Sequence, residues 1–179
     1  GLFVASHGAL LNGSKMIWLP RLDTKELIKH MPRSTVMMGV PTFYVRLLLD
    51  PAFTKKIAKN MRLFISGSAP LLTETFNSFK ERIGQTILER YGMSETVMLV
   101  SNPYKGDRVG GSVGLPLPQT KVRVRKDDGS LCGVNEIGNV EVKGPNIFKG
   151  YWRMPEKTKE EFTSDGWFKT GRSEEHTSE

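Results

Sequence analysis

The sequence predicts an α/β fold, in which a mainly parallel α/β part is followed by a smaller, mostly β part. Over residues 1–100, short apolar runs alternate with amphipathic helical stretches, which indicates strands joined by helical crossovers. Over residues 101–150, nine glycines and four prolines interrupt any helical period, and alternating segments replace it. We therefore expect one part at 1–100 and a second, β-rich part at 101–171.

The first part is predicted as an alternation of strands and helices. The apolar run at 15–19, which ends at Pro20, predicts a buried strand. Asp23 stands three residues before Glu26, which predicts the capped start of a helix that ends at Pro32. Apolar runs, a helix-starting proline and a terminal glycine predict the rest: a strand at 35–38, a helix at 42–49, a short helix, a strand at 63–65, a helix ending at Gly84 and a short strand at 86–88.

The second part is predicted from alternation and turn residues. Residues 121–125 alternate strictly between basic and apolar side chains, and Asp127 to Gly129 supply a turn. Residues 137–142 predict a further strand. The second part is therefore expected to contain little helix.

Composition and charge exclude several classes of protein. The 179 residues are 38% hydrophobic and 25% charged, with a formal net charge of +7, as in an ordinary soluble globular chain. The longest uncharged stretch, 1–14, is too short to span a membrane. Basic residues are dispersed and match no nucleic-acid-binding motif, so no nucleic-acid partner is expected. The single cysteine, Cys132, predicts a reducing compartment, the cytoplasm or an organelle matrix.

The last eight residues, 172–179, differ from the rest because they include no apolar side chain. Natural disorder explains such a composition. A sharper interpretation is that they translate AGATCGGAAGAGCACACGTCTGAA, which resembles a sequencing-library adapter, so that the segment is a non-native tail. It holds one Arg and three Glu, and without it the chain carries +9.

One candidate site is the loop 66–70, which directly follows the strand predicted at 63–65. Ligands of open α/β sheets bind at the carboxyl ends of the strands, and small residues there allow a ligand to approach the backbone. The hydroxyls of Ser66 and Ser68 and the free amides are suited to phosphate or to a flat heterocycle. The alternative is an ordinary tight turn between a strand and a helix.

A second candidate is the segment 89–96, again after a predicted strand. It combines an aromatic ring for stacking (Tyr91), a hydroxyl for phosphate (Ser94) and a carboxylate for a divalent cation (Glu95). The alternative is a polar loop with Tyr91 and Met93 packed inward, which accounts for the same residue types.

A third candidate is Arg46, which stands between Val45 and Leu47 in an otherwise apolar predicted helix. Such a guanidinium either extends to water along its alkyl stem or pairs with a carboxylate through two hydrogen bonds.

Taken in order, these segments resemble the adenylate-forming superfamily of acyl-CoA synthetases, luciferases and peptide-synthetase adenylation domains. Segment 89–96 is similar to the superfamily's adenine and magnesium motif, and 66–70 to the loop beside the nucleotide and acyl group. Further motifs follow in the superfamily's order: 111–114 with Pro116 and Pro118, 144–145 with 149–152, and 166–171. The resemblance implies that the chain is part of the superfamily's large domain.

Within the superfamily, the chain resembles the malonyl-CoA synthetase (malonate–CoA ligase) family of bacterial type. The segments that carry this resemblance are 1–6, 38–44 with Arg46, 61–70, 101–104 with 106–108, and 148–159. It implies an AMP-forming ligase of fatty acid metabolism that uses ATP, Mg²⁺ and CoA. Malonate, or a similar small dicarboxylate, would be activated as malonyl-AMP and then transferred to the CoA thiol.

The resemblance also implies roles for individual residues. Ser94 and Glu95 are assigned to catalysis, Ser94 at the α-phosphate and Glu95 as a magnesium ligand. Arg46, Ser66 and Met93 are assigned to the malonyl end of the substrate. The residues assigned to the nucleotide are Gly67, Ser68, Ala69, Glu89, Arg90, Tyr91 and Gly92.

The chain departs from the family pattern in ways that predict an internal fragment. The glycine-rich phosphate loop, the hinge and the small C-terminal domain are absent, and Arg172 stands where the family has an aspartate. The chain alone is therefore expected to be inactive and to need the missing N- and C-terminal parts of its parent. The alternatives are a synthetase for another short carboxylate such as methylmalonate, one for an aryl or acyl substrate, or a non-enzymatic basic binding module.

Overall fold

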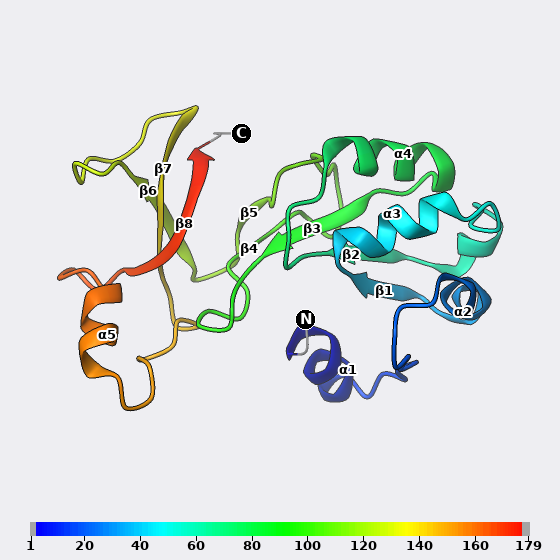
Figure 1. Ribbon diagram of the computed structural model, residues 1–179, viewed down its shortest axis with the longest axis horizontal. Helices are drawn as coiled ribbons and strands as arrows, with labels where there is room; N and C mark the ends of the chain where they lie inside the picture. The colour runs from blue at the N-terminus through cyan, green and yellow to red at the C-terminus, as the bar shows by residue number, and fades with distance from the viewer. Residues whose placement is uncertain (1–2, 177–179) are drawn as a thin grey trace. The chain divides into compact units, whose positions relative to one another are not determined.

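The structure, a computed structural model, describes residues 3–176, and the chain divides into two compact units (Figure 1). Unit 1 comprises Gly1–Met93 with Val100–Leu115, and unit 2 comprises Ser94–Leu99 with Pro116–Glu179. The elements up to residue 101 are η1 (Phe3–His7), α1 (Gly8–Leu11), α2 (Thr24–His30), η2 (Met31–Arg33), β1 (Val36–Gly39), α3 (Pro41–Leu49), η3 (Ile57–Asn60), β2 (Leu63–Ser66), α4 (Thr73–Ile83), β3 (Ile87–Tyr91) and β4 (Val100–Ser101). The short strand β5 (Leu115–Pro116) and unit 2's β6 (Lys121–Arg125), β7 (Glu136–Lys143), α5 (Pro155–Glu161) and β8 (Phe168–His176) follow.

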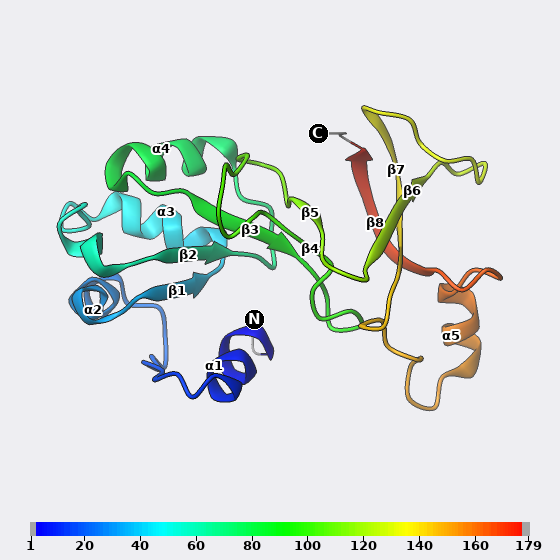
Figure 2. The same ribbon diagram turned by 180° about the vertical axis from the view of Figure 1, so that it is seen from behind.

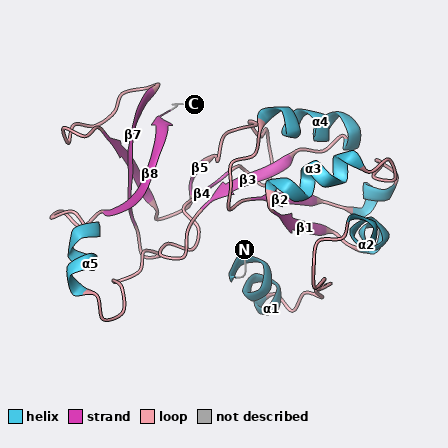
Figure 3. Ribbon diagram, viewed as in Figure 1, coloured by secondary structure: helices cyan, strands magenta, loops and turns pink. Residues whose placement is uncertain are grey.

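Unit 1 is built on a sheet whose strands follow the order β1-β2-β3-β4-β5 (Figure 3). β1 and β2 pair in parallel with Val36 opposite Leu63, and β2 and β3 pair in parallel with Phe64 opposite Ile87. β4 is antiparallel to β3. The predicted parallel α/β arrangement is therefore confirmed for β1 to β3, whose carboxyl ends lie at one edge, and the sheet is mixed beyond them.

Helices α3 and α4 cover one face of this sheet (Figures 1 and 2). Phe79 of α4 lies at the centre of an aromatic cluster, with ring centroids 4.9 Å from Phe64, 5.6 Å from Tyr44 and 5.7 Å from Phe53. All four rings are almost completely buried. Burying a large apolar side chain contributes about 1.5–3 kcal/mol, so this cluster is a principal source of unit 1's stability.

The local signals for the helices of unit 1 are confirmed. The Asp23 side chain accepts a hydrogen bond from the Glu26 amide and caps α2. Pro41 occupies the first turn of α3. Gly84 ends α4 in the left-handed conformation, at a φ of 74°.

The strand predicted at 15–19 is wrong, because these residues have no regular structure. Trp18 is 71% exposed, and Met16 and Ile17 are more than one-third exposed. A strand forms only when a neighbour accepts its backbone hydrogen bonds, and no described strand pairs with this segment. The apolar composition of this segment was therefore not enough to predict a strand.

Unit 2 contains an antiparallel sheet in the order β6-β7-β8. The strands predicted at 121–125 and 137–142 are confirmed as β6 and β7, and Val142 and Phe168 are buried in their core. β8 continues through Arg172 to His176, beside 136–139 of β7, so the sheet includes most of the segment interpreted as a non-native tail. Residues 177–179 lie outside the described residues.

Within the described part of the chain, no helix is both long and apolar enough to cross a membrane.

Candidate functional site

The loop after β2 combines buried and exposed polar groups. Ser66, the last residue of β2, is 1% exposed, and its Oγ has no hydrogen-bond partner among the described residues. Gly67 is also buried, whereas Ser68 and Ala69 are exposed. Ser68 has a φ of 69°, in the left-handed region that non-glycine residues rarely adopt. A buried unpaired hydroxyl beside strained backbone is a pattern that clusters at binding sites.

Arg90 of β3 lies against this loop. A Cβ atom added to Gly67 would be 2.9 Å from Nη1 and 3.1 Å from Cζ of Arg90, so only glycine permits this approach. The buried Nε of Arg90 has no hydrogen-bond partner among the described residues. Desolvation lowers the pKa of the Arg90 guanidinium. A partly desolvated cation against the loop that begins at Ser66 is suited to an anionic ligand.

Tyr44 of α3 contacts the strand end that leads into the loop at 66–69. Its hydroxyl is fully buried and donates a 2.5 Å hydrogen bond to the Ile65 carbonyl, one residue before Ser66. Burial raises the pKa of Tyr44 strongly, so the phenol remains a neutral donor. Tyr44 was not among the predicted site residues, although its place in the segment 38–44 marked it as part of a family motif.

Glu89 lies inside unit 1, with 5% of its surface exposed. Its Oε1 accepts a 3.0 Å hydrogen bond from the Gly111 amide, and the Leu71 amide also donates to the carboxylate. Burial raises the pKa of Glu89, and these two amides oppose the shift. Glu89 therefore joins two loops of unit 1, and its assignment to the nucleotide remains a prediction.

Tyr91, Gly92 and Met93 are all partly exposed. The Tyr91 hydroxyl lies 3.8 Å from the Met93 sulfur and donates to it. The tyrosine is thus neither fully packed inward nor free of its neighbours, and its face remains the predicted stacking surface for adenine.

The predicted catalytic pair, Ser94 and Glu95, belongs to unit 2. Ser94 is exposed and Glu95 is half-buried. The Glu95 carbonyl accepts a 2.8 Å hydrogen bond from the Phe148 amide, and its Oε1 accepts a 3.2 Å hydrogen bond from the Tyr151 hydroxyl. The contact with Tyr151 was not predicted from the sequence.

Glu95 is the carboxylate predicted to hold magnesium. The described residues contain no cluster of three or more His, Cys, Asp or Glu side chains that could hold a metal. Mg²⁺ bound together with nucleotide phosphates needs only one or two protein carboxylates, because water and phosphate supply the other oxygens. A single positioned carboxylate at Glu95 fits that mode of binding, and it does not fit an all-protein metal cage.

Arg46 lies on α3, at the last turn of the helix. Its side chain is exposed on α3 and lines a shallow depression with the residues that begin α2. Neither Ser66 nor Arg90 lines this depression. The Arg46 side chain is thus open to solvent, and its contact with substrate remains a prediction.

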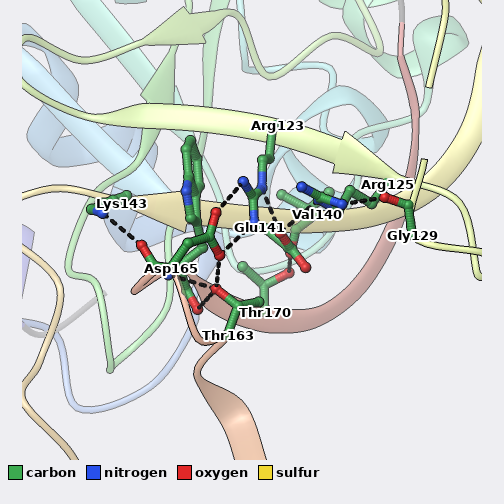
Figure 4. Close-up of polar contacts among 10 residues, drawn as sticks. Arg123, Arg125, Gly129, Val140, Glu141, Lys143, Thr163, Asp165 and Thr170 are labelled. Atoms are coloured by element: carbon green, nitrogen blue, oxygen red, sulfur yellow. Dashed lines mark hydrogen bonds and ion pairs between the residues drawn. The ribbon is translucent and has the colours of Figure 1, made fainter. Parts of the chain in front are cut away.

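Unit 2 also contains a charged network that the sequence analysis missed (Figure 4). Arg123 Nε lies 2.6 Å from Glu141 Oε2, and Arg123 Nη1 lies 2.8 Å from Asp165 Oδ2. The guanidinium also lies 4.2 Å from the centre of the Trp167 ring. Hydrogen bonds from Arg123 and Thr163 hold the pKa of Asp165 far below its usual range. The available signal was the basic–apolar alternation at 121–125, which marks a strand; the β6–β7 register then places Arg123 directly opposite Glu141.

The fold and the loops after β2 and β3 are those of a nucleotide-binding class of enzymes. The family model described as AMP-binding enzyme matches residues 1–152, and the chain belongs to that family.

Individual members of this family are similar to the chain over nearly its whole length. The chain is 38% identical to a malonate–CoA ligase of Arabidopsis thaliana, over 96% of this chain and 31% of the relative. It is 53% identical to the ATP-bound crystal structure of MatB from Rhodopseudomonas palustris, with a TM-score of 0.95 over 99% of this chain and 35% of that one. A malonyl-CoA ligase solved as a ternary product complex with methylmalonyl-CoA and AMP is 32% identical, with a TM-score of 0.89 over 99% of this chain and 39% of that one. The chain thus spans about a third of the length of the relatives that it matches.

Proposed function

We propose that this chain is part of a longer ATP-dependent acid–CoA ligase that activates malonate. The observation that carries the proposal is the Arg90 guanidinium, held against Gly67 with a buried Nε that has no described partner, at a loop whose preceding residue, Ser66, has an unpaired hydroxyl among the described residues. The similarity to a malonate–CoA ligase and to an ATP-bound MatB supports the same activity. Expected substrates are malonate, ATP and CoA.

The charge of malonate explains why this arrangement suits it. Malonate has two carboxylates, and one must be held while the other reacts. An arginine donates two parallel hydrogen bonds to a carboxylate, and it retains its charge even when partly desolvated. We propose that Arg46 and Ser66 face the unreacted carboxylate and that Met93 shapes the acyl pocket, as predicted from the sequence. The sequence prediction placed Arg90 at the nucleotide; because its guanidinium lies against Gly67, we propose that it also contributes to holding this carboxylate. A ligase for fatty acids would line the pocket at Arg46 with apolar side chains.

The reaction has two steps. A carboxylate oxygen of malonate attacks the α-phosphorus of ATP and displaces pyrophosphate, which gives malonyl-AMP. The thiol of CoA then attacks the acyl carbon, and AMP leaves with the former carboxylate oxygen. The first step converts a poor leaving group into a good one.

The chain's residues orient the reactants for this chemistry. We propose that Tyr91 stacks on adenine, that the backbone of 67–69 borders the nucleotide, and that Ser94 donates to the α-phosphate. Glu95 would hold Mg²⁺, which supplies positive charge to the phosphates when bound. Glu89, fixed by the Gly111 amide, keeps the intervening loop in place. The longer protein is proposed to work in the cytoplasm or an organelle matrix.

The test compares arginine variants in the full-length ligase. Malonate-dependent and butyrate-dependent pyrophosphate release is measured for Arg90→Leu, for Arg46→Leu and for the control Arg33→Leu, whose side chain is exposed and contacts His30. Arg90→Leu is expected to lower kcat/KM for malonate at least tenfold more than for butyrate, Arg46→Leu to show the same direction, and Arg33→Leu to match wild type. Unchanged malonate kinetics in both Arg90→Leu and Arg46→Leu would overturn the assignment.

Methylmalonate is a second candidate substrate, because one similar ligase is solved with methylmalonyl-CoA. Both acids present the same second carboxylate, and they differ by one methyl group at the carbon between the carboxylates. Competition between the two acids for wild-type enzyme ranks them: a higher kcat/KM for methylmalonate would make it the principal substrate.

A further inference from the structure

The segment that includes Glu95 is held by a distant stretch of unit 2. Asn146 Nδ2 donates to the carbonyls of Thr96 and Met98, at 2.9 Å each. The Phe148 amide donates to the Glu95 carbonyl at 2.8 Å, and the Tyr151 hydroxyl donates to Glu95 Oε1 at 3.2 Å. Three of these hydrogen bonds fix backbone carbonyls. The bond from Tyr151 alone among the four reaches the carboxylate.

Tyr151 is itself rigidly supported. Its amide donates a 2.9 Å hydrogen bond to Thr158 Oγ1, and Thr158 is bonded in turn to the Met154 carbonyl. A Cβ atom added to Gly150 would be 2.7 Å from Thr158 Cγ2, so the glycine allows the chain to pass close to α5. The phenol ring packs edge-on against Phe148, with centroids 4.8 Å apart.

The aromatic support continues into the sheet. Phe148 also packs against Phe168 of β8, with ring centroids 5.1 Å apart, and Phe168 is 1% exposed. The position of the Tyr151 hydroxyl is therefore determined by both α5 and the core of unit 2. A donor that is fixed in this way restricts the rotamers of the carboxylate that accepts from it.

We propose that Tyr151 is a positioning residue that orients the Glu95 carboxylate for the metal–nucleotide complex. By donating to Oε1, Tyr151 would restrict the orientation of the Glu95 carboxylate and leave Oε2 available to hold the cation. The inference rests on the proposed function, in which Glu95 meets Mg²⁺ with ATP. Outer-shell donors of this kind typically change metal affinity about tenfold or more when removed.

The test uses Tyr151→Phe in the full-length ligase, which removes the hydroxyl and retains the ring packed on Phe148. The matched control is Tyr104→Phe, because the Tyr104 hydroxyl accepts a 3.0 Å hydrogen bond from Arg62 in unit 1. Glu95→Gln and the double variant complete a cycle. Binding of Mn²⁺, a spectroscopic replacement for Mg²⁺, is measured by electron paramagnetic resonance with a non-hydrolysable ATP analogue, without acid substrate or turnover.

Tyr151→Phe is expected to weaken Mn²⁺ binding about tenfold, while Tyr104→Phe binds as wild type does. In kinetics, the Mg²⁺ concentration for half-maximal rate rises by a similar factor, and kcat at saturating Mg²⁺ stays within about twofold. In the Glu95→Gln background, adding Tyr151→Phe is expected to have no further effect.

Two results would overturn the inference: equal Mn²⁺ affinity in wild type and Tyr151→Phe, or an undiminished effect of Tyr151→Phe in the Glu95→Gln background. Malonate-dependent pyrophosphate release by wild type, measured separately, reports on the proposed substrate. A ligase that binds Mn²⁺ as expected and rejects malonate would refute the substrate and leave the role of Tyr151 intact.

Discussion

Replacing Arg123 with Ala should destabilise unit 2 locally. Arg123 forms a 2.6 Å contact with Glu141, a two-pronged ion pair with Asp165 and a stacking contact with Trp167 (Figure 4). The Glu141 side chain is only 9% exposed, so it depends on a cationic partner. Arg125 is the remaining partner, with its Nε 3.5 Å from Glu141 Oε2.

The expected magnitude follows from these contacts. A hydrogen bond between charged groups contributes about 1.5–3 kcal/mol, and Arg125 retains part of it, which favours the lower end of that range. The cation–π contact with Trp167 adds about 0.5–1 kcal/mol. Asp165 is about half exposed, so its ion pair with Arg123 is partly screened by water and contributes less than the contact with Glu141. The free energy of local opening should therefore fall by about 2–3 kcal/mol, a factor of about 30 to 150 in the opening equilibrium.

Native-state hydrogen exchange of the full-length ligase measures this opening in peptides that cover β7. Arg125→Ala is the control, because its side chain is 32% exposed and its contact with Glu141 is longer. Arg123→Ala should reduce protection of β7 by about 30- to 150-fold, and Arg125→Ala by much less. Equal, small effects of both variants would refute the view that Arg123 anchors the sheet.

Three further predictions concern backbone and charge. Gly114→Ala should yield mostly insoluble or unfolded protein, because the added Cβ would overlap the backbone of Ser101 and Gly114 has a φ of 85°; soluble yield and circular dichroism measure this. The pKa of Asp165 is depressed in the folded state, so the ionised carboxylate stabilises the fold above its unfolded pKa, and this stabilisation is lost as pH falls through and below about 4. Asp165→Asn should therefore flatten the acid side of the pH profile of hydrogen exchange in β7. An unchanged profile would contradict this. Gly67→Ala should displace Arg90 and raise the KM for malonate with the melting temperature nearly unchanged; an unaltered KM would place malonate elsewhere.

Elements with strong local signals were predictable from the sequence. The Asp23 cap, the proline that begins α3 and the glycine that ends α4 act within a few residues of their positions, and all three are confirmed. The run at 15–19 resembled a strand because strand formation depends on a partner that local composition cannot reveal. Helix α5 was not predicted, because it buries no residue and its sequence therefore shows no apolar period.

In the candidate site, too, features with a local sequence signal were predictable, and contacts between distant segments were not. Small and hydroxyl residues after β2 and β3 marked the two loops, because the carboxyl ends of parallel strands are predictable once the strands are. The approach of Arg90 to Gly67 and the hydrogen bond from Tyr151 to Glu95 join segments far apart in the sequence. Such contacts depend on how the strands are ordered and how side chains pack, and neither is encoded in a local pattern.

The central claim, that the longer protein activates malonate through an acyl-adenylate, is tested most directly by isotope transfer. Malonate labelled with ¹⁸O in its carboxylates is incubated with ATP, Mg²⁺, CoA and the full-length ligase, and the AMP released is examined by mass spectrometry. Attack of the carboxylate on the α-phosphorus, followed by cleavage of the acyl C–O bond, predicts AMP with one ¹⁸O atom and an equal amount of malonyl-CoA. Malonyl-CoA formed with unlabelled AMP, or no malonyl-CoA at all, would contradict the account.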